Sequence, residues 1–349
     1  MKSAIYKFIF GCSALAIAAT ACNSDEQLSL SGDRTAANIS AGVGYSADNR
    51  ATRAADAAWG INDHIGITML ASPLPAQTAG QAPVGVVSGY SNQDYVTTAG
   101  DGKFTPASVD KILYYPLDGS AVTYKAYYPY TASLPANFVK PVDVTSQADL
   151  AAIDLMTAVH TNGSDSKDHP DVNLKFYHRL TKAVINLTAD SPIDLTGCKL
   201  VVKGLKTQGA YDLMGDNLSI NESSGADIQI PLKSNSGSAI LLPRAAGNGV
   251  VFEVTTANGG VYTAMMDAAL EFKGGFKYTF NITLKTTPIT VSATIEPWAE
   301  GTENSMDVVR LVTGLGDNAD FNDNDEIMLY LKDTKTAPGA DITNPEFAL

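Results

Sequence analysis

The sequence predicts an all-β fold of two stacked β-sandwiches, and three observations carry this prediction. Short runs of β-branched and aromatic residues recur along the chain, and clusters of Gly, Pro, Asn and Asp separate them. No long stretch keeps the apolar period of an amphipathic helix. Charged residues make up only 17% of the 349 residues, as is typical of sandwiches with many turns. Helices should therefore be few and short.

The N-terminus reads as an export signal and not as part of the fold. Lys2 and Lys7 precede an apolar run, residues 8–18, that is too short to span a bilayer. Small residues then lead into Cys22, an ending that resembles a bacterial lipobox. Residues 1–21 are thus predicted to be a signal peptide, and Cys22 the first residue of a lipoprotein, acylated with a fatty acid such as palmitate. The alternative is that an ordinary signal peptide is cleaved and that Cys22 has no role in the process.

Net charge bears on the partners of this chain, and its cysteine content bears on how the fold is stabilised. After residue 53, 19 basic and 33 acidic residues remain, a net charge of −14. This acidity argues against nucleic acid as a partner and against electrostatic docking to anionic lipid. Cys198 is the one cysteine after Cys22, so no intramolecular disulfide is expected and stability must come from core burial. We interpret Cys198 as a buried small hydrophobe at a strand start.

A strand is predicted just before the globular part of the chain. In residues 38–45 the apolar side chains alternate, a period of two that indicates a strand with one buried face: Ile39, Ala41, Val43 and Tyr45. A segment rich in turn and small residues follows and contains Arg50 and Arg53. The globular part begins at Trp59.

The remaining strands follow in order, with one helical candidate at residues 148–158. Strands are predicted over residues 65–70, 85–88, 109–115, 121–130, 172–177, 183–187, 199–202, 238–242, 250–255, 277–284 and 289–295. The loop at residues 161–171, rich in Gly, Ser, Asp and Pro, is the natural domain boundary. We therefore predict an N-terminal β-sandwich over residues 54–168 and a C-terminal β-sandwich over residues 169–300.

Several motifs, taken in chain order, resemble the fimbrillin-like family. They span most of the chain, and it is their order that makes the set specific: Trp59–Ile67, Ile112–Pro116, Tyr124–Tyr130, Asp154–Ala158, Phe176–Lys182, Gly274–Phe280 and Ile289–Trp298. The residues after Cys22, Ser24 to Glu26, also resemble the acidic export tag of surface-exposed lipoproteins.

The resemblance implies a structural and adhesive subunit of a type V pilus, or fimbrium, built from two transthyretin-like β-sandwich domains. It also implies export as a lipoprotein to the outer membrane and cell surface, then removal of an N-terminal segment by an extracellular Arg-specific protease. A strand from another pilus subunit would fill the groove that is left. The lipidated pro-segment would be residues 22–53.

The cleavage site follows from the position of the arginines. Cutting after Arg53 would detach both the strand at residues 38–45 and the lipid at Cys22. Arg50 is the second choice and Arg34 the third, because a cut at Arg34 would leave the strand in place. The alternative is that these arginines only decorate a linker.

The C-terminal tail, residues 301–349, is the candidate donor strand. Within residues 307–331 two segments carry alternating apolar side chains: Val309, Leu311 and Leu315, then Ile327, Leu329 and Leu331. The alternative is that the tail packs on its own second domain as extra strands, which would favour a tip or accessory position. Alternate oxygen ligands at Asp320, Asn322 and Asn324 suggest calcium, but the glycine and the final glutamate of a calcium loop are missing, so no metal is predicted.

No catalytic constellation is found, and neither an enzymatic activity nor a cofactor is expected. The four histidines, His64, His160, His169 and His178, lack metal-ligand spacing, and His178 is expected to make a structural hydrogen bond. The clustered tyrosines of residues 114–130 would form strand cores or, less simply, a sugar-stacking platform. A second hypothesis for the function is therefore a monomeric surface lipoprotein that binds glycans or host ligands.

Overall fold

A computed structural model describes residues 34–44, 58–247, 249–285, 289–297 and 304–312. Cys22, Tyr45, Arg50 and Arg53 lie outside these residues, as does the tail beyond Val312. The described residues from Thr35 onward fall in one compact unit. The division into two sandwiches at residues 168–169 therefore stays a prediction.

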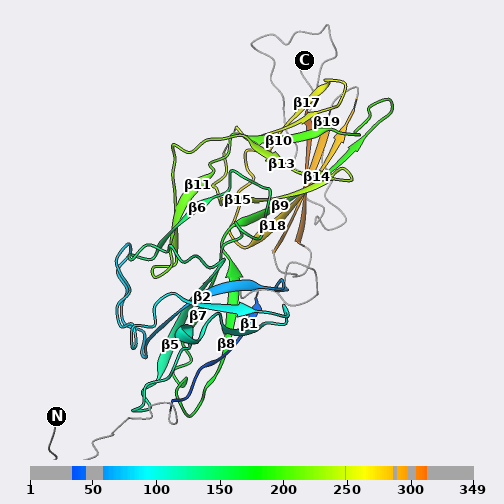
Figure 1. Cartoon of the computed structure of the whole chain (residues 1–349). Helices are drawn as coiled ribbons and strands as arrows, with labels where there is room; N and C mark the ends of the chain where they lie inside the picture. Colours follow the sequence, from blue (N-terminus) through cyan, green and yellow to red (C-terminus); the bar gives the residue numbers. More distant parts are fainter. Residues whose placement is uncertain (1–33, 45–57, 248, 286–288, 298–303, 313–349) are drawn as a thin grey trace, which may run out of the picture. The chain divides into compact units, whose positions relative to one another are not determined.

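The prediction of an all-β chain is confirmed (Figure 1). Among the described residues, the helical structure in the element order is a single 3-10 turn, η2 (Val109–Lys111). All other elements are strands, arranged in one closed barrel and three open sheets.

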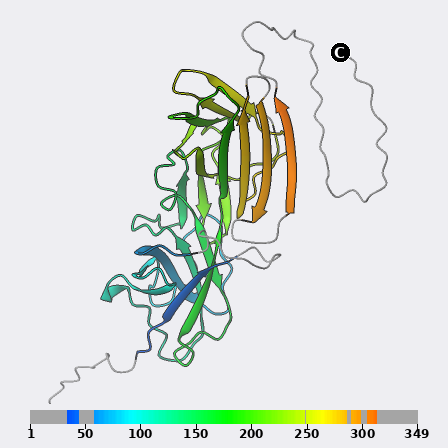
Figure 2. The ribbon, with the colours of Figure 1, turned by 90° about the vertical axis from the view of Figure 1, so that its right-hand side faces the viewer.

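The first part of the chain closes into a barrel. Its strands follow one another around the barrel in this order: β1 (Asn38–Val43), β4 (Lys103–Pro106), β3 (Gln93–Thr97), β2 (Asp63–Ala71), β5 (Val122–Tyr128), β7 (Met156–His160) and β8 (Asp171–His178). β1 pairs antiparallel with β4 and parallel with β8, from Asn38 opposite Asp171 to Val43 opposite Phe176. Figure 2 shows β1 in blue beside the green β8. The predicted sandwich is thus a barrel here, because β1 joins both edges of what would otherwise be an open sheet.

The barrel interior is filled by alternate side chains of its strands. Ile65 and Ile67 of β2, Tyr124 of β5 and Phe176 of β8 are buried in one cluster with Trp59. β8 alternates between exposed and buried residues, as a strand with one wet face does. Every residue of β5 is buried, since its outer face also packs, with Tyr127 in a second cluster that includes Tyr211.

The later part of the chain forms three open sheets. The six-stranded sheet runs β14 (Leu232–Lys233), β15 (Ser236–Leu241), β9 (Thr181–Ala189), β18 (Phe276–Leu284), β19 (Ile289–Pro297) and β20 (Asn304–Val312). The four-stranded sheet runs β13 (Ile228–Ile230), β10 (Lys199–Lys203), β16 (Val251–Thr255) and β17 (Val261–Met265). The three-stranded sheet runs β12 (Asn217–Ile220), β11 (Gln208–Asp212) and β6 (Val139–Asp143).

The six- and four-stranded sheets share one apolar core. It contains Ile185 and Phe280 from the first sheet and Val202 and Phe252 from the second. The rings of Phe252 and Phe280 lie 4.9 Å apart between centroids. Cys198 packs against this core next to the start of β10, half-buried, and burial raises the pKa of its thiol.

Three local predictions were wrong. Residues 148–158 form turns and then β7, because the Asp149 carboxylate accepts the backbone N–H groups of Ala151 and Ala152 and stabilises a turn. The run at residues 109–115 begins as the 3-10 turn η2, with Val109 exposed. Residues 85–88 make one isolated bridge, from Val86 to Leu70, because the chain there enters the left-handed region at three positions: Gly85, Ser88 and Gly89.

The β1 seam, a candidate assembly site

The candidate site is the β1 seam, which we define as β1 together with the groove between β4 and β8 that it fills. Ala37, Ile39 and Ala41 point into the barrel core and are 8%, 5% and 6% exposed. Val43 is partly buried and packs against the same cluster. The alternation predicted from the sequence is therefore present in the described part of this strand, and whether the strand is removable stays a prediction.

The backbone of β1 is bonded on both sides. Beyond the ladder pairs, Asn38 donates its N–H to the carbonyl oxygen of Pro170 at 2.9 Å, and Gly44 donates to Phe176 at 2.7 Å. On the other side Ala41 donates to the carbonyl oxygen of Gly102 at 2.7 Å. The outward Asn38 side chain adds a bond to the Asp171 carboxylate at 2.8 Å. β1 thus satisfies the polar edges of two strands at once.

Trp59 completes the seam from inside the barrel. Its indole N–H donates to the carbonyl oxygen of Ala41 at 2.7 Å. Its ring lies edge-on against Phe104 of β4 and Phe176 of β8, with centroid distances of 5.0 and 5.1 Å. Edge-to-face contacts of this kind stabilise aromatic cores. One side chain therefore contacts β1 and both of its neighbouring strands.

Gly102 permits the close approach of β4 to β1. Its φ is +81°, in the left-handed region, and an added Cβ would lie 2.6 Å from the carbonyl oxygen of Ala41. A side chain at this position would both strain the backbone and push β1 away.

A pocket of about 240 Å³ opens at the C-terminal end of β1, lined among others by Val43, Trp59, Asp63, Tyr128 and His178. The Tyr128 hydroxyl donates to Asp63 at 3.0 Å, and burial, with Asp63 beside it, raises the pKa of Tyr128. Nδ1 of His178 lies 2.9 Å from the Asp154 carboxylate. This pair is the structural hydrogen bond predicted for His178.

The other histidines with an ion-pair partner contact single carboxylates. Nδ1 of His64 lies 2.7 Å from Asp94, and Nε2 of His160 lies 3.0 Å from Asp165. Within the part of the chain that the structure describes, no group of three or more His, Cys, Asp or Glu side chains is placed to hold a metal ion. The acidic loop that contains Asp320 lies outside the described residues.

Most of the tyrosine cluster is buried, with Tyr115, Tyr124 and Tyr128 in the barrel core and Tyr127 in the cluster outside it. Tyr115, Tyr124, Tyr127 and Tyr128 are all buried, whereas Tyr114 and Tyr130 are partly exposed. Four buried rings cannot stack on a sugar at the surface, so the strand-core interpretation of this cluster fits better than the platform.

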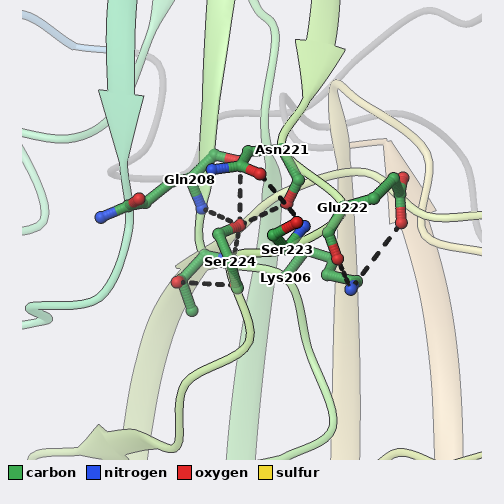
Figure 3. Close-up of polar contacts among 7 residues, drawn as sticks. Lys206, Gln208, Asn221, Glu222, Ser223 and Ser224 are labelled. Atoms are coloured by element: carbon green, nitrogen blue, oxygen red, sulfur yellow. Dashed lines mark hydrogen bonds and ion pairs between the residues drawn. The ribbon is translucent and has the colours of Figure 1, made fainter.

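A cluster of polar residues, separate from the β1 seam, surrounds the turn that follows β12 (Figure 3). The Ser224 hydroxyl bonds the carbonyl oxygens of Asn221 and Gln208 at 2.6 and 3.2 Å. The Lys206 ammonium bonds the Glu222 carbonyl and lies 3.8 Å from its carboxylate. These groups satisfy one another, so the cluster stabilises a turn and presents no catalytic arrangement.

The predicted donor segment begins within β20. Val309 and Leu311 lie opposite Ser292 and Thr290 of β19, at the edge of the six-stranded sheet. Residues 304–312 therefore pair with the chain's own six-stranded sheet, as the alternative for the tail predicts. The other candidate donor residues lie outside the described residues: Leu315, Ile327, Leu329 and Leu331.

No helix in the described ranges is long and apolar enough to cross a membrane.

The fold is similar to that of solved proteins from Bacteroides species. It is similar to a "putative cell adhesion protein" from Bacteroides uniformis, with a TM-score of 0.64 and 26% identity, covering 76% of this chain and 100% of that one. A "putative cell adhesion protein" from Bacteroides ovatus shares the fold, with a TM-score of 0.58 and 23% identity, covering 76% and 100%.

Sequence relatives identify the family. The model of the fimbrillin-like family matches residues 52–298. A Bacteroides uniformis protein with the name "Putative fimbrium subunit Fim1C" is 32% identical over 262 residues, 72% of this chain and 82% of that protein. The chain belongs to the fimbrillin-like family, and this membership supports a role as a pilus subunit at the cell surface. β1 and β20 both lie outside the matched residues.

Proposed function

We propose that this protein is a structural and adhesive fimbrium subunit that is exported as a lipoprotein, matured by Arg-specific cleavage and polymerised by donor-strand exchange. The role is structural and not catalytic. Its partners are other pilus subunits, an extracellular Arg-specific protease and, before maturation, the outer membrane through a lipid at Cys22.

The observation that carries the proposal is the position of β1. It fills a seam between two strands, yet in the sequence it precedes the whole barrel and is joined to it through residues 45–57. Loss of β1 would leave the facing edges of β4 and β8 unpaired, and an open strand edge is a template for another chain. Burial of a side chain such as Ile39 is worth about 1.5–3 kcal/mol, so an incoming strand with similar side chains would be held firmly.

The joining segment contains the proposed cleavage sites. Arg53 lies 31 residues after Cys22, and Arg50 is the second choice. A cut at either position separates β1 and the lipid from the rest of the barrel in one step. Arg34 serves as a control, since a cut there would leave β1 attached.

The donor strand of the proposal comes from the tail of another copy, residues 307–331. β20 is an edge strand paired only with β19 among the described residues, so its departure breaks a single ladder. β1 and the tail are also the two segments that lie on either side of the family match. A strand added to a sheet edge binds through its main chain and is selected by its alternate side chains.

The test is N-terminal sequencing of protein sheared from the cell surface. The expected result is a start at Ala54 in high-mass species. Arg53→Gln combined with Arg50→Gln should abolish these species, whereas Arg34→Gln should not. Acylated full-length protein that starts at Cys22 and is found only as a membrane-bound monomer would overturn the proposal. That result would favour a monomeric surface lipoprotein that binds glycans or host ligands.

A further inference from the structure

A buried cluster of polar side chains lies at the end of the barrel away from the pocket. Tyr124 of β5 lies opposite His160 of β7 in the ladder. The pocket lies at the other end of the same two strands, where Tyr128 lies opposite Met156. We define the base cluster by four residues: Tyr115, Tyr124, His160 and Asp165. It brings together an imidazole, a carboxylate and two phenol groups, and each of these can be a metal ligand.

Three atoms of the base cluster are buried and make no hydrogen bond to the described residues. They are the hydroxyl oxygen of Tyr124, Nε2 of His160 and Oδ2 of Asp165. Tyr124 is 0% exposed and Asp165 is 1% exposed. Because buried polar atoms nearly always have a partner, three such atoms in one place mark a site for a bound polar group or ion.

The separation of two of these atoms suits a shared metal ion. Nε2 of His160 and Oδ2 of Asp165 lie 3.0 Å apart, yet they are not aligned as hydrogen-bond donor and acceptor. Nitrogen and oxygen ligands lie about 2.0–2.2 Å from a metal such as zinc, so two ligands at a right angle are separated by about 3.0 Å. Such ligands point toward the metal and not toward each other. The pair therefore fits neighbouring corners of an octahedral site.

Asn162 holds the Asp165 carboxylate in place. Its side-chain N–H donates to Oδ1 of Asp165 at 2.7 Å, and its side-chain oxygen accepts the backbone N–H of Asp165 at 3.2 Å. One carboxylate oxygen is thus occupied, while the other, Oδ2, lies beside His160. Partners that orient a ligand in this way are a regular part of metal sites.

The charges of the donor groups favour a trivalent ion. Burial raises the pKa of Tyr115 to about 12 and also raises the pKa of Tyr124, and the nearby Asp165 carboxylate adds to both shifts. Both phenols are therefore neutral at pH 7 without a metal. Once deprotonated, the two phenols and Asp165 supply three negative charges, which balance a 3+ ion in a buried site. Iron suits a mixture of imidazole and anionic oxygen ligands.

We propose that the base cluster binds a ferric ion through the phenol oxygens of its two tyrosines, Nε2 of His160 and Oδ2 of Asp165. Binding releases the two phenol protons to solvent. The ion enters beside the His160 side chain, which is 19% exposed. It links β5 and β7 to the loop after β7 and to the segment before β5. The N–H of Tyr115 also bonds the carbonyl oxygen of Thr35 at 3.0 Å, so the ion stabilises the chain where it enters β1. The inference does not depend on donor-strand exchange.

Titration with iron tests the site. Full-length protein is dialysed against a chelator and titrated with ferric nitrilotriacetate, while the visible absorption band of iron-bound phenolate is recorded. The band should saturate at roughly one iron per chain. The melting temperature should rise with iron concentration, and less with Zn²⁺ or Mn²⁺. Absence of both effects with iron would overturn the proposal, and a larger rise with Zn²⁺ or Mn²⁺ would overturn the ferric assignment.

Tyr124→Phe distinguishes a metal ligand from a structural hydroxyl. Because this hydroxyl makes no hydrogen bond to the described residues, its loss should leave the melting temperature of the iron-free protein nearly unchanged. The rise in melting temperature with iron should disappear. The matched control is Tyr127→Phe, also in β5, whose hydroxyl donates to Asn92 at 2.8 Å. It should lower the stability but keep the response to iron, and equal responses in both variants would contradict the proposal.

Two histidine variants check that the iron binds in the base cluster. His160 and His64 each contact one carboxylate, at 3.0 and 2.7 Å. His160→Ala should weaken iron binding by at least about tenfold, and Asn162→Ala by about 10–100-fold, whereas His64→Ala should leave it unchanged. If His64→Ala weakened iron binding as much as His160→Ala, the iron would be bound elsewhere and the proposal would be wrong.

Discussion

The indole N–H of Trp59 donates a buried hydrogen bond of 2.7 Å to the carbonyl oxygen of Ala41, the residue at the middle of the inward face of β1. The two residues come from opposite sides of the segment at 45–57. In the proposed maturation, Trp59 would therefore stay with the groove, and Ala41 would leave with the removed strand. The bond therefore helps to hold β1 in the seam.

Trp59→Phe should weaken the attachment of β1 to the barrel. Phenylalanine keeps an aromatic ring beside Phe104 and Phe176 but leaves the carbonyl oxygen of Ala41 buried without a partner, at a cost of about 1–3 kcal/mol. The free energy of unfolding in urea measures the effect. Ile61→Ala, at an exposed site two residues away, should change it by less than about 0.5 kcal/mol. Equal effects of the two substitutions would contradict the role given to Trp59.

Gly102→Ala should destabilise the protein more than Gly80→Ala. Both glycines have positive φ, +81° and +69°, so both variants carry the backbone strain of an L-residue there. Only at Gly102 does the new Cβ meet a backbone atom, the carbonyl oxygen of Ala41 at 2.6 Å, whereas nothing lies within 4 Å at Gly80. The difference in the free energy of unfolding should reach about 1–3 kcal/mol, the usual cost of overpacking. A difference near zero would show that β1 can move away freely.

A protein that starts at Ala54 should bind a synthetic peptide of residues 35–45. The peptide restores both ladders of β1, and its binding should raise the melting temperature in proportion to the logarithm of peptide concentration. The same peptide with Ile39→Asp should not bind measurably, because it buries a carboxylate in the core. The peptide with Ser40→Asp, altered on the outer face, is the matched control and should still bind.

Stability should fall in alkaline solution above pH 10. Burial raises the pKa of Tyr95 to about 12, with its oxygen accepting the N–H of Leu113, and burial likewise raises the pKa of Tyr115 to about 12. Because the folded-state pKa lies above the unfolded value, the stability contributed by Tyr95 is fully present below pH 10. It is lost as the pH rises through 12, up to about 2–3 kcal/mol.

Urea unfolding measured between pH 10 and 12, with Tyr95→Phe as the comparison, checks whether ionisation of Tyr95 causes the loss of stability. The variant should show a shallower decline between pH 10 and 12, since one buried phenol no longer titrates. An identical slope in both proteins would contradict it.

Local sequence patterns predict many of the strands, but they do not predict which strands pair, as the β1 seam shows. The alternation at residues 38–43 predicts a strand with a buried face, and β1 has one. Its parallel pairing with β8 was not predicted, because period and propensity do not specify a partner 133 residues away. The barrel was therefore read as an open sandwich.

Strands with interrupted patterns were missed for a different reason. β6 contains Pro141 and β11 contains Gly209, residues that lower strand propensity, yet the two strands pair, with Pro141 opposite Ala210 and Gly209 opposite Val142. The contact between Trp59 and Ala41 also has a weak sequence signal, since a buried indole N–H needs an acceptor but the sequence does not say which one.

The parallel pairing of β1 with β8 also sets an order of events. β1 is the first strand of the barrel along the chain and β8 is the last, so the seam cannot be completed until the whole barrel sequence has emerged. Contacts of such long sequence separation form late during folding. Hydrogen exchange at the amides of Ala41 and Gly44 would report this seam as the last part of the barrel to gain protection. A folding chain thus passes through a stage with an unfilled seam, and under the proposed function its own β1 would then compete, by proximity alone, with the strands of neighbouring subunits.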